Sequence, residues 1–224
     1  MRREKPATAK AEETRERIVD AALELFRKEG FDQTTMRDIA GQASVATGAA
    51  YYYFGSKEEL VMAFYVRTAE EARVLLPSIM ERSTDLRKRL RAIIDLRLSQ
   101  FAKHRRLFIA LARIGIDPAH PLSPFGKDTR SMRDESIDAF RLALQGSTVR
   151  IPKDLHDQLP ALLWLYMMGV ILFWIFDDSP GQARTRTLLD GTLDLIVRLI
   201  QLSGLPLMGP VRRRLLRTIQ AATI

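Results

Sequence analysis

The chain has 224 residues, of which 46% are hydrophobic, and this is enough for one large or two modest domains with a real core. It contains no cysteine, which excludes a disulfide scaffold, thiolate metal ligands and thiol nucleophiles, and fits a reducing compartment. The formal charge of +8 predicts an anionic partner, such as nucleic acid or a membrane surface.

Residues 1–13 mix basic and acidic side chains without an apolar period, so we predict a mobile arm. Such an arm is either a plain tail or a source of extra phosphate or minor-groove contacts, and it has no apolar stretch typical of a signal peptide. Thr14 is expected to cap the first helix, which should end near Gly30. The apolar face of this helix comprises Ile18, Ala21, Ala22, Leu25 and Phe26.

Two short helical patterns follow and meet at a tight turn. Thr35 and Asp38 have the spacing of a capping box at the start of the first pattern. The turn falls near Ser44, and the second helix is expected at residues 46–52, with small side chains that allow close approach to a groove. A second capping box, Ser56 to Glu59, places Lys57 at a helix N-terminus, which favours an anion.

Three pieces of this region carry a family resemblance: TRERIVDAALELFRKEGFDQTT, MRDIA and YYYFGSKEEL. Residues 14–61 resemble the DNA-binding domain of TetR-family transcriptional regulators. The resemblance implies a dimeric, all-helical regulator whose N-terminal domain binds DNA and whose C-terminal domain binds a small molecule. Residues 1–57 hold ten Lys/Arg against nine Asp/Glu, so this pattern, rather than local basicity, predicts DNA binding.

The chain departs from the family's pattern at three positions. The family usually has Gly at the position of Ser44, Ser at that of Ala46, and a larger aliphatic residue at that of Ala50. Ser adopts a left-handed turn conformation only at a cost of about 1 kcal/mol. Ala cannot cap a helix through its side chain, which costs a further ~1 kcal/mol. We therefore predict a loosely held motif that orders on DNA.

The second helix of the motif is expected to lie in the major groove of DNA. The residues expected to face base edges are Arg37, Thr47, Gly48, Ala49 and Tyr51. The resemblance assigns phosphate contacts to Tyr51, Tyr53 and Lys57. Tyr52 and Phe54 are instead expected to pack under the following helix.

After residue 60 one helical pattern follows another, without convincing strand alternation. Helices are expected at residues 57–81, 86–114 with a break near 103–106, 127–144, 156–176, 184–203 and 210–222. Pro77 should kink the first of these or end it early, and Asp177 and Asp178 should form a turn. The predicted fold is all-α, with a three-helix helix-turn-helix domain at 14–62 and a helical effector-binding and dimerisation domain at 63–224.

Two basic stretches in this part have alternative interpretations. A solvated helix face is expected for Arg87, Lys88, Arg89 and Arg91. The segment 210–222 is amphipathic, with Val211, Leu215, Leu216 and Ile219 on one side and Arg212, Arg213, Arg214 and Arg217 around the other. It is either an extra packed helix or a basic surface that meets DNA or lipid.

Residues 159–176 carry no formal charge over eighteen positions, which reaches the lower limit for a membrane span. A helix that is apolar all round also arises where one face lines a core and the other a subunit interface. With the N-terminal resemblance we favour the second interpretation, and expect a cytoplasmic homodimer without a membrane partner. The predicted four-helix interface comprises Met167, Val170, Ile171, Trp174, Leu188, Thr192, Leu195 and Leu199.

Catalysis finds little support, because the three histidines are scattered and no phosphate-binding glycine pattern occurs. We expect that the protein is not an enzyme and that it has neither a cofactor nor a metal site. The effector should be a hydrophobic or aromatic small molecule. The effector site is expected to be lined by Phe101, His104, Phe108, Phe140, Trp164 and Met168. The alternative interpretation is that these residues pack in the core. The predicted function is a repressor that binds a palindromic operator and is released by this effector, with a ligand-independent activator or architectural protein as the alternative.

Overall fold

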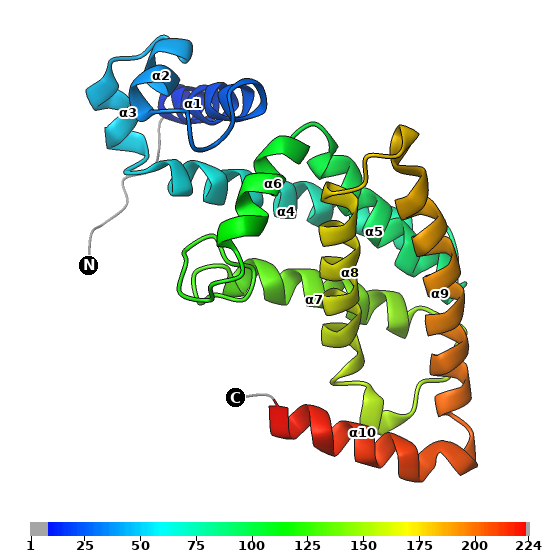
Figure 1. Ribbon diagram of the computed structural model, residues 1–224. Helices are drawn as coiled ribbons and strands as arrows, with labels where there is room; N and C mark the ends of the chain where they lie inside the picture. Colours follow the sequence, from blue (N-terminus) through cyan, green and yellow to red (C-terminus); the bar gives the residue numbers. More distant parts are fainter. Residues whose placement is uncertain (1–8, 223–224) are drawn as a thin grey trace. The chain divides into compact units, whose positions relative to one another are not determined.

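The computed structural model describes residues 9–222, which contain helices and no strand (Figure 1). The chain divides into two compact units. The first comprises the chain up to Glu70 together with Phe101–Met132, and the second comprises Glu71–Gln100 together with the chain from Arg133 onwards. This grouping differs from the predicted boundary at residue 62, because residues 101–132 belong with the N-terminal helices.

The first unit contains α1 (Ala9–Lys28), α2 (Met36–Gln42), α3 (Thr47–Tyr53), the start of α4 (Lys57–Glu81) and α6 (Arg105–Ile114). Ile18, Ala22 and Phe26 of α1 are 0% exposed and follow one another at helical spacing, so they form the inward stripe of this unit. The predicted cap at Thr14 is wrong: α1 begins five residues earlier, and the Thr14 hydroxyl donates to the carbonyl of Lys10. Residues 9–13 of the predicted arm are therefore helical, while residues 1–8 lie outside the described part.

The end of α1 is tied to α6. Gly30 has a φ of 99°, a conformation that glycine adopts without strain, and it turns the chain out of the helix. The guanidinium of Arg106 on α6 donates hydrogen bonds to the carbonyls of Lys28 and Glu29. These carbonyls are among those that the last turn of a helix leaves without an intrahelical partner. Arg106 thus caps α1 from a segment that is distant in the sequence.

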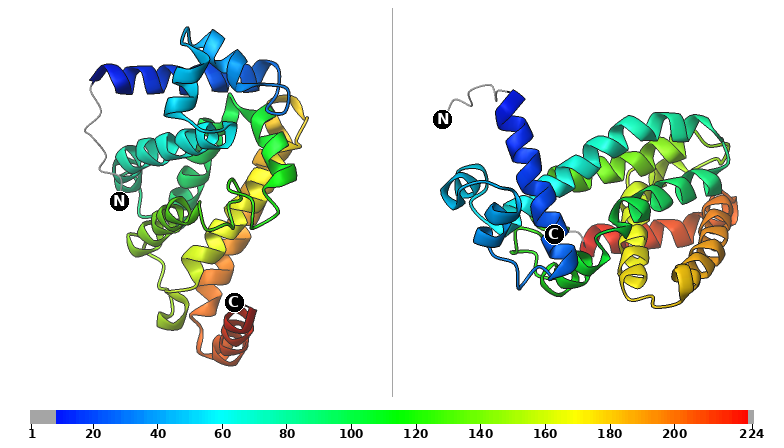
Figure 2. Two further views of the ribbon diagram at one scale, coloured as in Figure 1. Left: turned by 90° about the vertical axis from the view of Figure 1, so that its left-hand side faces the viewer. Right: turned by 90° about the horizontal axis from the view of Figure 1, so that it is seen from above.

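The second unit contains the rest of α4, most of α5 (Leu86–Ala102) and α7 (Arg130–Gln145), and then α8 (Leu159–Ile175), α9 (Ala183–Ser203) and α10 (Gly209–Ala222). Short 3₁₀ turns lie at Lys153–Leu155, Pro180–Gln182 and Pro206–Met208. α4 has the predicted bounds and continues through Pro77 to Glu81, so of the two expected effects of the proline the early end is wrong. Figure 2 shows α10 in red, following α9.

Arg89 of α5 is buried in the second unit and is only 7% exposed, so its predicted place on a solvated face is wrong. Its guanidinium donates to four carbonyls, those of Met80, Ser83, Leu142 and Ala143, at 2.7–3.0 Å. Burial lowers the pKa of Arg89. A Cβ on Gly146 would overlap a guanidinium nitrogen of Arg89, so a larger residue there would displace this guanidinium. One buried cation therefore joins the ends of α4 and α7 to α5.

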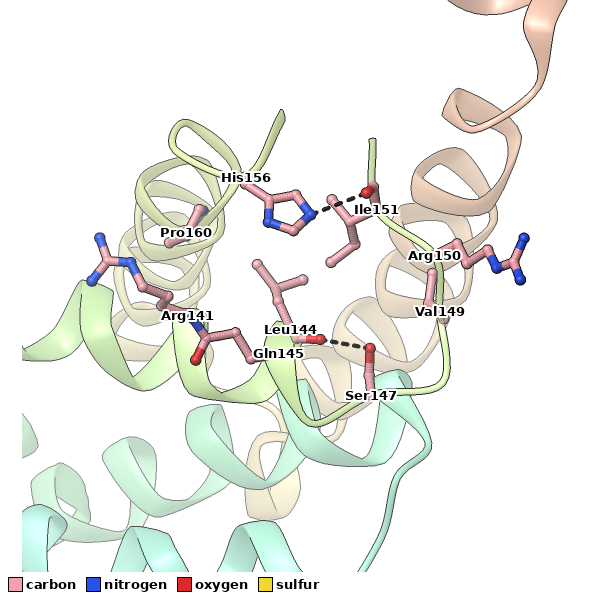
Figure 3. A pocket seen from close by; sticks show the side chains of 9 residues that line it. All are labelled: Arg141, Leu144, Gln145, Ser147, Val149, Arg150, Ile151, His156 and Pro160. Atoms are coloured by element: carbon pink, nitrogen blue, oxygen red, sulfur yellow. Dashed lines mark hydrogen bonds between the residues drawn. The ribbon is translucent and has the colours of Figure 1, made fainter. Parts of the chain in front are cut away.

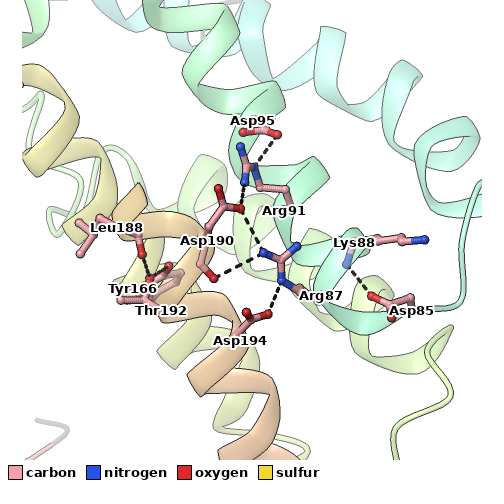
Figure 4. A network of polar contacts seen from close by, with 10 residues as sticks. All are labelled: Asp85, Arg87, Lys88, Arg91, Asp95, Tyr166, Leu188, Asp190, Thr192 and Asp194. Atoms are coloured by element: carbon pink, nitrogen blue, oxygen red, sulfur yellow. Dashed lines mark hydrogen bonds and ion pairs between the residues drawn. The ribbon is translucent and has the colours of Figure 1, made fainter. Parts of the chain in front are cut away.

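The neighbouring arginines connect α5 to α9 (Figure 4). Arg87 donates to Asp194 at 2.5 Å and to Asp190 at 3.0 Å, and Arg91 donates to Asp190 at 2.5 Å. The hydrogen bond that Arg87 donates to the Asp194 carboxylate raises the pKa of Arg87, against a smaller opposing effect of burial. Because these groups are partly exposed, we expect each pair to contribute only ~0.2–1 kcal/mol, and we assign the network a role in fixing helix register.

Asp177 organises the turn between α8 and α9, as the sequence predicted. One carboxylate oxygen accepts from the backbone N–H and hydroxyl of Ser179, and the other accepts from the same two groups of Thr185. Burial alone would raise the pKa of Asp177, but these hydrogen bonds outweigh burial and hold the pKa well below its usual value. Within residues 9–222, no helix combines the length and the apolar character that a membrane crossing needs.

Candidate nucleic-acid interface

The start of α2 has the predicted capping box. The Thr35 hydroxyl accepts from the Asp38 N–H at 3.2 Å, and the Asp38 carboxylate accepts from the Thr35 N–H at 3.0 Å. Both N–H groups would otherwise lack partners at the helix start. Hydrogen bonds from Thr35 lower the pKa of Asp38. The entry into the motif is thus fixed by two side chains.

The turn after α2 confirms the expected left-handed conformation, because Ser44 has a φ of 54°. The N–H of Val45 donates to the Ala40 carbonyl at 3.0 Å, and the N–H of Ser44 donates to the Gly41 carbonyl at 3.1 Å. This pair of bonds is the Schellman motif, in which the left-handed position usually holds glycine. A serine therefore sits at the one position of the motif where a Cβ is strained.

α3 presents an uncharged outer face. Ala50 is 0% exposed and anchors the helix to the unit, whereas Thr47 and Gly48 are exposed. A Cβ built on Gly48 meets no atom within 4 Å, so the surface beside it is open. Ala46 makes no side-chain cap bond, as predicted. Ala49 is half-buried, and Arg37 on α2 is exposed.

The aromatic run at the end of α3 divides differently from the prediction. Phe54 is buried at 3% exposure, as expected, but Tyr52 is 84% exposed and does not pack under α4. Tyr51 is 53% exposed, and Tyr53 is half-buried beside Tyr52 with ring centroids 5.4 Å apart. Tyr52 is therefore a candidate contact residue that the sequence analysis missed. The helical spacing from Thr47 and Gly48 to Tyr51 and Tyr52 could have revealed it.

Lys57, which is predicted to contact a phosphate, makes two contacts within the first unit. Its ammonium donates to the Phe31 carbonyl at 2.7 Å and lies 4.6 Å from the centroid of the Phe31 ring. The Ser56 hydroxyl accepts from the Glu59 N–H, but the Glu59 carboxylate accepts from the N–H of Gly55, not of Ser56. The helix start is thus capped, although without the predicted reciprocal box, and Lys57 holds the loop that follows α1.

The predicted effector residues fall into two groups, one in each unit. Phe101, His104 and Phe108 converge in the first unit with Phe64 and Tyr65 of α4. The rings of Phe101 and Phe108 stack at 4.0 Å, and the ring of Phe64 lies 5.0 Å from that of His104. We call these five residues the aromatic cluster. The remaining three belong to the second unit, where Phe140 and Trp164 are buried and Met168 is half-buried.

His104 has the only buried side-chain nitrogen or oxygen, among the described residues, that lacks a hydrogen-bond partner, its Nδ1 atom. Burial lowers the pKa of His104, and Arg67 and Lys103 lower it further. The imidazole is therefore held neutral near pH 7, so one ring nitrogen is an acceptor. A polar group inside an aromatic cluster is what orients a mostly apolar ligand.

A pocket of about 340 Å³ lies in the second unit, at the connection between α7 and α8 (Figure 3). Its lining comprises Arg141, Leu144, Gln145, Ser147, Val149, Arg150, Ile151, His156 and Pro160. The His156 ring contacts the Ile151 carbonyl at 3.0 Å, while the guanidinium of Arg150 points away from the pocket in Figure 3. None of the predicted effector residues lines this pocket.

The predicted dimer residues also divide. Met167, Val170, Ile171 and Trp174 of α8 are at most 7% exposed within one protomer, so they have little surface to offer a partner. Leu188 and Thr192 of α9 are half-buried, and Leu195 and Leu199 are exposed. The exposed apolar side chains of the two helices are Leu165, Leu172, Phe173, Phe176, Leu195, Leu199 and Leu202. On α8, the exposed apolar surface is therefore formed by Leu165, Leu172 and Phe173, with Phe176 directly after the helix, and not by the four predicted residues.

Comparison with known proteins identifies the class. Residues 18–64 match the family described as bacterial regulatory proteins of the tetR family, and residues 89–213 match the tetracyclin repressor-like C-terminal domain. The second match alone covers more than half of the chain. The chain belongs to the TetR family of transcriptional regulators.

Individual relatives are similar over shorter stretches. The HTH-type transcriptional regulator SrpR of Pseudomonas putida is 49% identical over 55 residues, which are 25% of this chain and 26% of SrpR. The HTH-type nicotine-responsive transcriptional repressor HdnoR of Paenarthrobacter nicotinovorans is 26% identical over 102 residues, 46% of this chain and 53% of HdnoR. The chain thus spans about a quarter and about half of these curated relatives.

The crystal structure of a TetR-family transcriptional regulator from Pectobacterium atrosepticum has the same fold. The two structures superimpose with a TM-score of 0.65 at 23% identity, over 86% of this chain and 96% of that chain. At this identity the likeness extends to the fold alone.

Proposed function

We propose that the protein is a DNA-binding repressor that acts as a homodimer and is released from its operator by a hydrophobic small molecule. The observation that carries the proposal is the outer face of α3, where Thr47, Gly48, Tyr51 and Tyr52 are exposed together without a charge. A short helix held from behind by a buried alanine, and open on its other side, suits insertion into a major groove.

Each side chain of this face has a role that follows from its chemistry. Thr47 can hydrogen-bond to a base or touch a thymine methyl group, and Arg37 can pair with guanine. Gly48 and Ala49 allow the helix to approach closely. Tyr51, Tyr53 and Lys57 contact phosphates, which fixes the register of the protein on DNA without reading sequence. Tyr52 joins them because of its exposure.

The effector proposal rests on the aromatic cluster and on the unpartnered nitrogen of His104. Phe101, His104 and Phe108 supply aromatic surface and one hydrogen-bonding group, and Phe140, Trp164 and Met168 remain candidates in the other unit. We infer an aromatic effector with a polar group that forms a hydrogen bond with the neutral imidazole. The name of HdnoR describes a repressor that responds to nicotine, which agrees with control by a small molecule in this family.

A coupling route from effector to DNA follows from the same contacts. His104 immediately precedes α6, and Arg106, two residues later, holds the last carbonyls of α1. A ligand that displaces the ring of His104 also shifts Arg106, and hence the helix that supports the motif. An inducer must favour the state that binds DNA poorly, and reciprocity requires that operator DNA weaken effector binding by the same factor.

The test begins with a gel shift that uses the DNA upstream of the protein's own gene and of its neighbours. We expect binding at nanomolar concentration to one of these sites and not to random duplex of equal length. Loss of the shift on addition of an aromatic library compound identifies the inducer. A protein that binds all duplexes equally, and no compound, supports the alternative of a ligand-independent architectural protein. As a regulator of transcription the protein acts in the cytoplasm.

Three variants then distinguish phosphate contacts, which position the protein, from base contacts, which read the sequence. Lys57→Ala should weaken specific and random DNA binding alike and reduce the salt slope by about one counterion, with Tyr53→Phe milder. Lys103→Ala, an exposed lysine away from α3, is the control. Thr47→Ala should instead lose discrimination of about 1–3 kcal/mol at one base position. Unchanged salt slope in Lys57→Ala, with its fold intact, argues against the assigned face.

A further inference from the structure

The end of the chain has an unbalanced charge. Asp194 is the last acidic residue of the sequence, and five arginines follow it: Arg198, Arg212, Arg213, Arg214 and Arg217. Four of these belong to α10, which contains no carboxylate. Such a helix attracts an anionic surface.

Arg212 sets the orientation of α10. Its guanidinium donates to the Asp154 carboxylate at 2.7 Å and to the Ser203 carbonyl at 2.5 Å. Arg213, Arg214 and Arg217 are exposed, and their helical spacing places them on the side away from Arg212. The helix is therefore held by one arginine while three others face solvent.

Apolar side chains lie exposed beside this basic face. Leu205, which is 49% exposed, and Leu207, which is 90% exposed, lie between α9 and α10, and Val211, which is 59% exposed, lies in the first turn of α10. A surface that binds only phosphates needs no exposed leucine. An anionic lipid bilayer needs both kinds of residue, because arginines pair with headgroup phosphates while leucine enters the acyl boundary.

We propose that the segment from Leu205 to Arg217 docks on the surface of a bilayer that contains anionic lipids. Arg213, Arg214 and Arg217 contact the headgroup phosphates, and Leu207 and Val211 insert between them. This goes beyond the proposed repressor function and departs from the sequence prediction of no membrane partner. It requires no spanning helix.

Flotation of the full-length protein with lipid vesicles tests the proposal. Vesicles of phosphatidylcholine with about one third phosphatidylglycerol should carry the protein at low salt, and pure phosphatidylcholine vesicles should not. Since each arginine near an anionic surface contributes about 1 kcal/mol, changing Arg213, Arg214 and Arg217 together to Gln should lower vesicle affinity about 100-fold. Leu207→Gln should lower it about fivefold, and its 90% exposure leaves the fold unaffected.

The matched control changes Arg82, Lys88 and Arg184 to Gln, three exposed cations elsewhere in the same unit. It removes the same charge and should retain vesicle binding to within about twofold. Equal loss in both triple variants shows a non-specific effect of net charge and overturns the proposal. The proposal is also overturned if the wild-type protein does not bind anionic vesicles and the variant with Arg213, Arg214 and Arg217 changed to Gln loses binding to random DNA. Operator binding of each variant is measured in parallel, so that a failure of the proposed repressor function can be distinguished from a failure of membrane docking.

Discussion

Ser44 holds a backbone conformation that glycine adopts without strain, with a φ of 54°. We predict that Ser44→Gly stabilises the protein by about 1 kcal/mol and raises its melting temperature, without abolishing DNA binding. Thermal unfolding followed by circular dichroism measures this. Gln42→Gly, at the last residue of α2, should lower the melting temperature, because its backbone is helical and glycine there only weakens the helix. A lower melting temperature for Ser44→Gly contradicts the turn geometry.

His104 predicts a dependence of stability on pH. Because burial first, and Arg67 and Lys103 next, lower its pKa in the folded state, the unfolded chain binds the proton more readily. Stability from this site is therefore fully present above the ordinary histidine pKa near 6.5 and declines as the pH falls below it. His104→Phe should flatten the decrease in melting temperature between about pH 7 and 5.5. An identical pH profile in the variant contradicts the neutral imidazole.

At single positions, the sequence predicted structure best where hydrogen bonds and dihedral angles of the backbone determine which residue is preferred. The capping box of Thr35 and the left-handed Ser44 follow from local rules, and both are present. The predicted burial of Tyr52 and the predicted exposure of Arg89 were both wrong, because the surrounding structure decides how far each side chain is buried. An aromatic residue that is 84% exposed and an arginine that is 7% exposed both reverse the usual preference of their residue type.

At the scale of elements, Arg89 joins three helices through four carbonyls. Arg89→Met keeps the stem and removes the donors, so buried carbonyls lose their partners and the free energy of unfolding should fall by about 3 kcal/mol. Urea denaturation measures this change. Lys88→Met, one residue earlier and exposed, should cost less than about 0.5 kcal/mol. Similar values for the two variants would show that the four hydrogen bonds contribute little.

Element boundaries show the limits of local signals. The apolar periods predicted every long helix of the described part. The prediction that Thr14 caps the first helix was wrong, because α1 already begins at Ala9. The Thr14 hydroxyl donates a hydrogen bond to the Lys10 carbonyl inside this helix. Pro77 lies near the end of α4, and the helix continues past it for four residues to Glu81. The Thr14 contact is local, but a capping residue and a residue inside a helix have the same sequence signal, so the pattern alone did not place this boundary.

At the scale of the whole molecule, the apolar residues left exposed on α8 and α9 predict the dimer. Leu195→Glu places a charge on this surface, so we expect monomers by analytical ultracentrifugation, with loss of operator binding. Val74→Glu, at a 78% exposed position of α4, is the control and should remain dimeric. Monomeric wild type at micromolar concentration would contradict the proposed interface.

The sequence could not choose this surface on α8, because a helix that is apolar all round gives no preferred face. Burial within the protomer was needed to separate Met167 and Trp174, which are core residues, from Leu172 and Phe176, which are exposed. Of the five residues of the aromatic cluster, the sequence suggested only Phe101, His104 and Phe108, and it suggested them as a ligand lining. Aromatic residues indicate a core or a cavity equally well until their neighbours are known.

The most direct test of the central claim is selection of duplexes from a random-sequence pool by the wild-type protein and by Thr47→Ala. We predict that the wild type enriches a palindrome whose half-sites are centred about one helical turn, roughly 34–36 Å, apart. Thr47→Ala should enrich the same palindrome with relaxed preference at one position in each half-site. Enrichment of no sequence by wild type, or of identical sequences by both proteins, would contradict the assignment of α3 as the reading element.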